Sequence, residues 1–265
     1  MKFIHYFVAL VPSLGFSQEL FMGASAGAMA NSSVTTSDAL SIFNNPGTLG
    51  FVENDELTTG YRSFFQLEGW KTVYAAANKQ IAKGALGIGF SQFGDELYHT
   101  TQVAIGFGHQ LGIASLGISV RYQQLHILGF GSSTSWPVDV GGKVELSPHF
   151  LIASGIKNIN QAKLTKETDE RYPSLFFVGF SYQPTEFLVI SSQIDYSLLT
   201  PAIFRAGIAY SIGILTLRAG VKTNPVQLAT GIGFEWKRMA MDYAFLPHTS
   251  AGGSHFFTLS YQYSK

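Results

Sequence analysis

The sequence contains no cysteine, which excludes disulfide frameworks and thiolate metal sites. Charge is also scarce, because Asp, Glu, Lys and Arg make up 13% of the chain, about half of the usual share in a soluble domain. The 17 basic and 17 acidic residues balance, so no field of one sign attracts nucleic acid or an acidic substrate. No segment after the first residues has an apolar run long enough for a transmembrane helix. We therefore expect no nucleic-acid partner and no helical membrane anchor.

The first residues are typical of an export signal. Lys2 supplies a positive charge, and the following stretch to Phe16 is mostly apolar but too short to cross a membrane as a helix. Gly15 and Ser17 are small residues at the two positions that a signal peptidase reads before a cut. We predict a signal peptide over residues 1–17, which leaves 248 residues (265 − 17) in the exported chain.

Bulky apolar residues occupy alternate positions along most of the remaining chain. In residues 203–212, one parity holds Phe204, Ile208, Tyr210 and Ile212 with Ala206, and the other holds Arg205, Gly207, Ala209 and Ser211. A period of two predicts strands. Because the second parity is made of small residues and occasional charges, the pattern favours a transmembrane barrel whose apolar face meets lipid and whose interior is polar or small.

We predict an all-β fold, an antiparallel transmembrane β-barrel of about 14 strands spanning residues 54–265. The candidate strands lie near 54–64, 70–80, 83–93, 100–111, 114–126, 135–146, 149–158, 174–183, 187–196, 202–212, 214–223, 226–236, 238–246 and 254–264. Most have the length needed to cross a bilayer at a tilt. Residues 18–53 show little alternation and many Gly and Ala, so we expect a short plug-like segment with helical or loop structure there.

The predicted inward parity carries a balanced set of charges. These lumen charges are Arg121, Asp139, Asp195, Arg205, Arg218, Lys222, Glu235 and Asp242. They fit either an ordinary polar lining or a plugged lumen tied by cross-strand ion pairs. The inward glycines and alanines also leave two alternatives, space for an apolar ligand or close approach of the N-terminal segment, and we favour the close approach.

The chain holds 22 Phe and 12 Tyr. Aromatic residues near strand ends, such as Phe64, Trp70, Tyr122, Trp136 and Tyr196, predict girdles at the membrane interfaces, although an apolar patch that docks a large partner would look the same in sequence. Catalytic patterns are weak, since the histidines are isolated and no Gly-x-Ser-x-Gly motif occurs. We expect no enzyme activity, no metal and no cofactor.

Three motifs in order resemble the FadL superfamily of outer-membrane barrels, and within it the PorV/PorQ branch of Bacteroidota. The first is the Gly/Ala-rich stretch from Gly23 followed by Asn45-Pro46-Gly47; the second is Asp139-Val-Gly141 followed by Gly155-Ile-Lys-Asn158; the third is Asp242-Tyr243-Ala244 followed by Gly-Gly-Ser-His255. In this interpretation Asn45, Pro46 and Gly47 fix the N-terminal segment against the barrel, and Asp139, Asn158 and Asp242 tie neighbouring strands. The chain is short for the family and does not end on an aromatic residue.

The resemblance implies an outer-membrane location with lipid contact, and it implies two different functions. The leading hypothesis is an accessory component of type IX protein secretion that docks to a large protein partner, a translocon or attachment complex. The alternative is a FadL-like transporter of hydrophobic compounds. A purely structural barrel is the third hypothesis.

Overall fold

The computed structural model describes residues 21–164, 169–248 and 252–263. The strands are β1 Glu56–Ser63, β2 Lys71–Ile81, β3 Gly84–Gly94, β4 Tyr98–Leu111, β5 Ala114–Ile127, β6 Gly131–Ser135, β7 Val138–Ser147, β8 Phe150–Lys157, β9 Leu175–Thr185, β10 Leu188–Ser197, β11 Thr200–Ile212, β12 Leu215–Lys222, β13 Gln227–Trp236, β14 Met239–His248 and β15 Gly252–Gln262. The predicted signal peptide, residues 1–17, lies outside the described residues. No helix in the described part of the chain is long and apolar enough to span a membrane.

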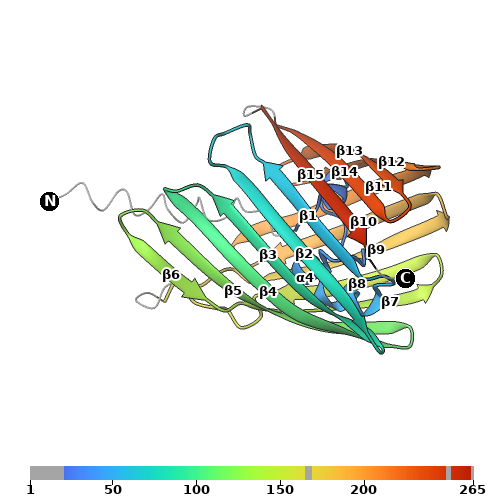
Figure 1. The fold of residues 1–265 in the computed structure, drawn as a ribbon, viewed down its shortest axis with the longest axis horizontal. Helices are drawn as coiled ribbons and strands as arrows, with labels where there is room; N and C mark the ends of the chain where they lie inside the picture. The colour runs from blue at the N-terminus through green and yellow to red at the C-terminus, as the bar shows by residue number, and fades with distance from the viewer. Residues whose placement is uncertain (1–20, 165–168, 249–251, 264–265) are drawn as a thin grey trace.

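The strands form one closed antiparallel barrel (Figure 1). Sequential strands pair with each other, and the β1–β15 pairing closes the ring. Both β6 and β7 pair with β5, β6 beside residues 123–127 and β7 beside residues 114–120. These two strands therefore share one place in the ring, separated by Trp136 and by Pro137, which has no N–H to donate to a ladder. The ring has fourteen places, which confirms the predicted fold class.

The predicted facing of the strands is also confirmed. On β11 the side chains of Phe204, Ile208 and Tyr210 are 44–48% exposed on the outside, whereas Arg205 and Ala209 are buried inside. The same alternation gives the whole barrel an apolar outer wall. A closed barrel with such a wall satisfies every backbone hydrogen bond internally while presenting apolar side chains to lipid.

The two ends of the barrel differ in their connections. Six connections of only two residues lie at one end, which we call the tight-turn end: 82–83, 112–113, 148–149, 186–187, 213–214 and 237–238. The opposite end, the loop end, carries longer connections, including 64–70 and 158–174. Outer-membrane barrels place short turns in the periplasm and longer loops outside the cell, so the loop end is the outer end.

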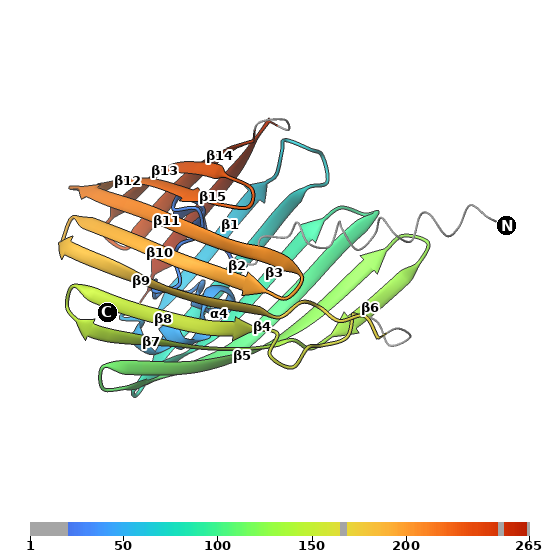
Figure 2. The same cartoon turned by 180° about the vertical axis from the view of Figure 1, so that it is seen from behind.

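The N-terminal segment lies inside the barrel, where Figures 1 and 2 show it in blue behind the strands. It contains the short helices α3 Ala24–Ala28 and α4 Ser41–Asn44 and the 3₁₀-helix η2 Pro46–Phe51. Its apolar side chains pack on small inward residues of the wall; Leu40, Ile42, Phe43 and Leu49, for example, share a buried cluster with Ala76, Ala85 and Ala104. The interior of the barrel therefore also contains the hydrophobic core of the protein.

Candidate functional site: a packed lumen and an aromatic vestibule

Glycines of the inner wall mark where the N-terminal segment touches it. A Cβ atom at Gly117 on β5 would overlap the carbonyl oxygen of Pro46, and one at Gly89 on β3 would overlap the Phe43 ring. Gly108, Gly207 and Gly231 make equally close contacts with residues of the segment. Of the two alternatives left open by the sequence, close approach of the segment is confirmed for these glycines. We call this filled region the packed lumen.

The Asn45-Pro46-Gly47 turn is fastened to β5 and β7. The Asn45 side chain donates to the carbonyl oxygens of Val34, at 2.9 Å, and Gly142, at 3.3 Å, and accepts from the Gly47 N–H at 3.0 Å. The Ser115 hydroxyl donates to the Gly47 carbonyl at 2.6 Å. Gly47 itself lies against the backbone of Gly142 with no space for a side chain. These contacts lie where the sequence motif placed the attachment of the segment.

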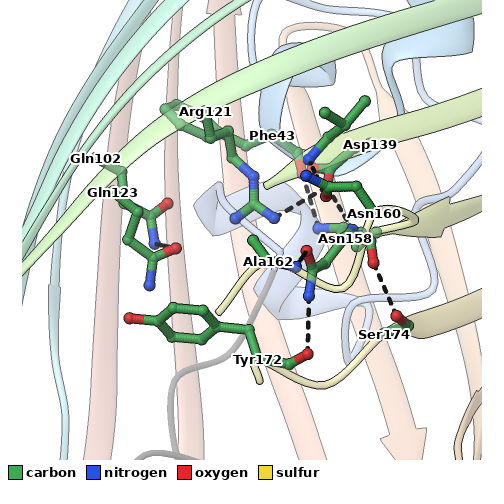
Figure 3. Close-up of polar contacts among 12 residues, drawn as sticks. Phe43, Gln102, Arg121, Gln123, Asp139, Asn158, Asn160, Ala162, Tyr172 and Ser174 are labelled. Carbon is green, nitrogen blue, oxygen red and sulfur yellow. Dashed lines mark hydrogen bonds and ion pairs between the residues drawn. The ribbon is translucent and has the colours of Figure 1, made fainter. Parts of the chain in front are cut away.

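Asp139 and Asn158 lie together at the base of the longest loop (Figure 3). Asp139 on β7 accepts from Arg121 Nη2 at 2.9 Å and from the Asn158 backbone N–H at 2.8 Å, both at the same oxygen. The Arg121 and Asp139 side chains are 8% and 1% exposed, so the pair is buried. A buried carboxylate needs such partners because desolvation otherwise destabilises it.

The same Asn158 binds both described parts of the connection between β8 and β9, residues 158–164 and 169–174. Its side chain donates to the Tyr172 carbonyl at 2.8 Å and accepts from the Ala162 N–H at 2.9 Å, while its own carbonyl accepts from the Ser174 hydroxyl (Figure 3). Its φ of 53° is a conformation that asparagine tolerates better than most residues. Burial raises the pKa of the Tyr172 phenol, against the smaller effect of its hydrogen bond to Gln123. The described parts of the loop, residues 158–164 and 169–174, are thus tied to each other at the mouth of the barrel.

Two further ion pairs cross the inner wall. Arg205 Nε lies 2.6 Å from Asp195 on the neighbouring strand β10, and the same guanidinium donates to the carbonyl of Ala30 in the segment. Arg218 on β12 reaches Asp242 on β14 at 2.6 Å by passing over Gly233 of the strand between them. A side chain at Gly233 would occupy the space of this pair.

The last two predicted lumen charges lie near opposite ends of the barrel. Lys222 ends β12 at the loop end and lines the cavity described below. Glu235 has the inward parity, but it is exposed at the tight-turn end of β13 and is not enclosed by the lumen. Glu235 is the last residue but one of β13. It lies beyond the part of the inner wall that the N-terminal segment covers.

Above the packed lumen, at the loop end, the barrel holds a cavity of about 470 Å³, which we call the vestibule. Its apolar lining includes Phe21, Phe64, Phe65, Trp70, Phe93, Leu175 and Phe256. The rings contact each other edge to face, with centroids 5.6 Å apart for Phe64–Phe256 and 6.2 Å apart for Trp70–Phe93. The size lies in the range of small-molecule sites, which are mostly apolar and aromatic.

Phe21 forms the floor of the vestibule and is held by cations. Lys157 Nζ lies 4.1 Å from the Phe21 ring centroid, and the Arg205 guanidinium carbon lies 5.7 Å from it. Arg62 donates to the Phe21 carbonyl at 2.7 Å. Because cation–π contacts strengthen when water is excluded, the floor is a well-anchored boundary between vestibule and packed lumen.

The inward placement of Phe64 and Trp70 corrects a prediction. We expected both in an interfacial girdle, but Phe64 is 7% exposed and both line the vestibule. The sequence did contain a signal for the inward placement of Phe64, since this residue lies two positions after the inward-facing Arg62. Tyr122, Trp136 and Tyr196 do face outward. The two remaining motif residues also face outward and meet there, with Tyr243 Oη 2.8 Å from His255 Nδ1.

The fold and the apolar outer wall together define a membrane-spanning β-barrel of the outer-membrane class, with a filled lumen and one open mouth. No protein-family model and no curated protein sequence matches the chain. Solved structures of FadL-type outer-membrane proteins do match it.

The Ralstonia pickettii toluene transporter TbuX aligns with a TM-score of 0.68 and 14% identity, over 92% of this chain and 99% of that chain. The CymD monoaromatic hydrocarbon channel aligns with a TM-score of 0.68 and 12% identity, over 93% and 98%. A Pseudomonas aeruginosa FadL homologue aligns with a TM-score of 0.63 and 12% identity, over 92% and 98%. These likenesses confirm the FadL-type fold, while the PorV/PorQ branch stays a prediction.

Proposed function

We propose that this protein is an outer-membrane channel for small hydrophobic compounds, which bind in the vestibule before they cross. The observation that carries the proposal is the aromatic lining of a cavity of about 470 Å³ at the outer mouth of the barrel. Polar and charged residues, among them Asp195, Arg205, Lys222 and His248, also line the cavity. A mostly apolar and aromatic lining with a few polar groups is typical of sites for small apolar molecules. The neighbouring structures described as a toluene transporter and a monoaromatic hydrocarbon channel support the same class of substrate.

Because the lumen is divided into an open vestibule and a packed lower part, a solute in such a channel must first bind in the vestibule and then pass the packed part. Edge-to-face rings offer an apolar solute contact with other rings and release of water from the cavity wall. Below the floor at Phe21 the segment fills the lumen, so a bound molecule passes inward only if residues of the segment move. We infer that residues 21–53 act as the barrier of the channel and the vestibule as its receptor site.

A matched pair of substitutions tests this function. Phe65 and Phe130 both lie in connections at the loop end, but only Phe65 lines the vestibule, while Phe130 is 88% exposed. We expect Phe65→Ser to lower uptake of radiolabelled toluene by cells that express the protein by roughly three- to tenfold, the loss of one aromatic contact, and Phe130→Ser to leave it unchanged. Equal uptake by cells with and without the unsubstituted protein would reject the proposal.

A docking role in type IX protein secretion is the second candidate. The observation that favours it is the packed lumen, since buried ion pairs and a fastened segment suit a barrel that presents its surface and conducts nothing. Pull-down of the tagged native protein from outer membranes in mild detergent, with mass spectrometry, separates the two. Secretion components in near-equal amounts together with a secretion defect in a deletion strain would favour docking, whereas a lone barrel with bound apolar compounds would favour transport.

A further inference from the structure

The wall of the barrel is higher on one side than on the other. Strands β4 and β5 have 14 residues each, and β6 continues the pairing at the outer end of β5. On the opposite side β10 has 10 residues and β12 has 8, with the 13-residue β11 between them. Figure 2 shows β4, β5 and β6 extending well beyond the turn between β10 and β11. We call these two parts of the loop end the high rim and the low rim.

The low rim is apolar and fully open to its surroundings. Leu198 and Leu199, which form the β10–β11 turn, are 86% and 62% exposed, and Val226, next to β13, is 77% exposed. Immediately below them the lipid-facing wall is apolar as well, with Tyr196 on β10 and Phe204 on β11 half-exposed. Exposed apolar surface of this kind, continuous with a lipid-facing wall, is typical of contact with a membrane or a hydrophobic ligand.

The inner side of the same low rim belongs to the vestibule. Pro201 and Ile203 follow the Leu198-Leu199 turn, and Pro225 precedes Val226; all three line the cavity. One turn of chain therefore separates the lipid-facing wall from the aromatic lining. Polar residues also line the cavity on this side: Thr200 beside Pro201, and Lys222 and Asn224 beside Pro225.

The high rim has the opposite chemistry. Beyond the apolar wall residues Val103 and Ile105, the outward positions of β4, β5 and β6 are His99, Thr101, Gln124, His126, Ser132 and Thr134. An apolar solute moving up this side meets polar side chains before it reaches the exposed tip at Leu128 and Phe130. The tip is as apolar as the low rim, but it is not continuous with the lipid-facing wall.

We propose that apolar solutes reach the vestibule from the outer leaflet of the membrane, by crossing the low rim between β10 and β13. This inference rests on the proposed function and adds the source of the substrate, a compound already dissolved in lipid. At the β10–β11 turn the low rim offers it a mostly apolar path, from Leu198 and Leu199 to Pro201 and Ile203, in which Thr200 is the polar residue. Access from water over the high rim has no such path.

The absence of cysteine in the chain allows a reversible test. Leu198→Cys on the low rim and Phe130→Cys on the high tip have nearly equal exposure at the replaced side chain, 86% and 88%. A membrane-impermeant sulfonated methanethiosulfonate places a negative charge at either cysteine in intact cells, and dithiothreitol removes it. Uptake of radiolabelled toluene is measured before modification, after it and after reduction. Equilibrium quenching of Trp70 by bromobenzene is measured on purified protein in a Trp136→Phe, Trp236→Phe background.

We expect modification of Leu198→Cys to slow toluene uptake at least about tenfold, which corresponds to about 1.4 kcal/mol of barrier, and reduction to restore it. Quenching of Trp70 at equilibrium stays unchanged, because the charge blocks the path and not the site. Modified Phe130→Cys takes up toluene at the unmodified rate. Equal rates before and after modification of Leu198→Cys, or an equal loss in both variants, would overturn the route. If Trp70 is never quenched and the unsubstituted protein supports no uptake, the proposed function itself fails and the route with it.

Discussion

In the packed lumen the inward positions carry glycine, alanine, serine and paired charges, whereas the vestibule gathers phenylalanine and tryptophan rings beside polar residues such as Lys222 and His248. Ser115, Gly117 and Arg121 all lie at inward positions of β5, and each contacts the segment or a partner charge. Phe64 and Phe93 end the inward rows of β1 and β3 at the loop end. The difference indicates that one wall serves two purposes, to hold a segment of its own chain and to receive a foreign apolar molecule.

A large effect, loss of the seated N-terminal segment, is expected where the packed lumen has no spare space, because the neighbour at Gly117 is the backbone of Pro46 and Gly47. Gly117→Leu would place a side chain in the position of the Pro46 carbonyl, and overpacking of this kind destabilises by about 1–3 kcal/mol or more. We expect a lower urea midpoint and loss of the compact form of the barrel on unheated gels. Ala75→Leu on the outward face of β2 is the matched control, since it enlarges a small residue that faces lipid. Equal behaviour of the two variants would show that the segment does not press on this wall.

The second effect concerns the boundary between the two regions. Arg205→Ala leaves the buried Asp195 carboxylate without its guanidinium, a change that costs about 3–5 kcal/mol in comparable buried pairs. The double variant Arg205→Met, Asp195→Leu is expected to recover most of this stability, because neither charge of this pair is then left buried without its partner. Lys163→Ala, which removes an exposed pair with Asp169, should change stability by less than about 1 kcal/mol. A double variant as unstable as Arg205→Ala would contradict the account.

A substitution in the vestibule should separate binding from stability. Phe93 is only half-buried and faces the cavity, so Phe93→Ala is expected to lower the unfolding free energy by about 1 kcal/mol, well below the cost for a fully buried ring. The loss of bromobenzene binding, measured by Trp70 quenching, should be larger than this loss of stability, because the ring centroid of Phe93 lies 6.2 Å from that of Trp70. A variant that loses stability and keeps binding would place the receptor site elsewhere.

Much of this arrangement follows from the period of two. The alternation predicted the fourteen places of the ring and the outward apolar face, and the small inward residues predicted a segment inside. The vestibule was missed because aromatic residues near strand ends look alike in sequence whether they face lipid or the lumen. Counting parity from the strand interior distinguishes them: Phe93 lies two residues from the inward Ser91, and Phe256 lies two from the inward Thr258.

Other features depend on the closed barrel and not on local sequence. The Arg218–Asp242 pair forms only because β13 contributes Gly233 between two strands that are not adjacent. Likewise, Leu198 and Val226 are unremarkable turn residues until the barrel brings β10 and β12 to the low side of an uneven rim. No periodicity within a single strand contains that information.

The last effect lies in the packed lumen near the tight-turn end and depends on pH. Burial, with the nearby charge of Glu56, raises the pKa of the Asp38 carboxyl to about 7. A folded-state pKa above the unfolded value means that the folded protein binds the proton more tightly, so stability falls as pH rises from about 4 towards 7. Asp38→Asn stays neutral, and its stability relative to the unsubstituted protein should therefore increase across this range. Asp169→Asn, at a side chain 91% exposed, should show no such trend. Thermal midpoints at several pH values test both predictions. If the midpoints of Asp38→Asn and of the unsubstituted protein change in parallel with pH, this carboxyl does not weaken the packing of the N-terminal segment at neutral pH.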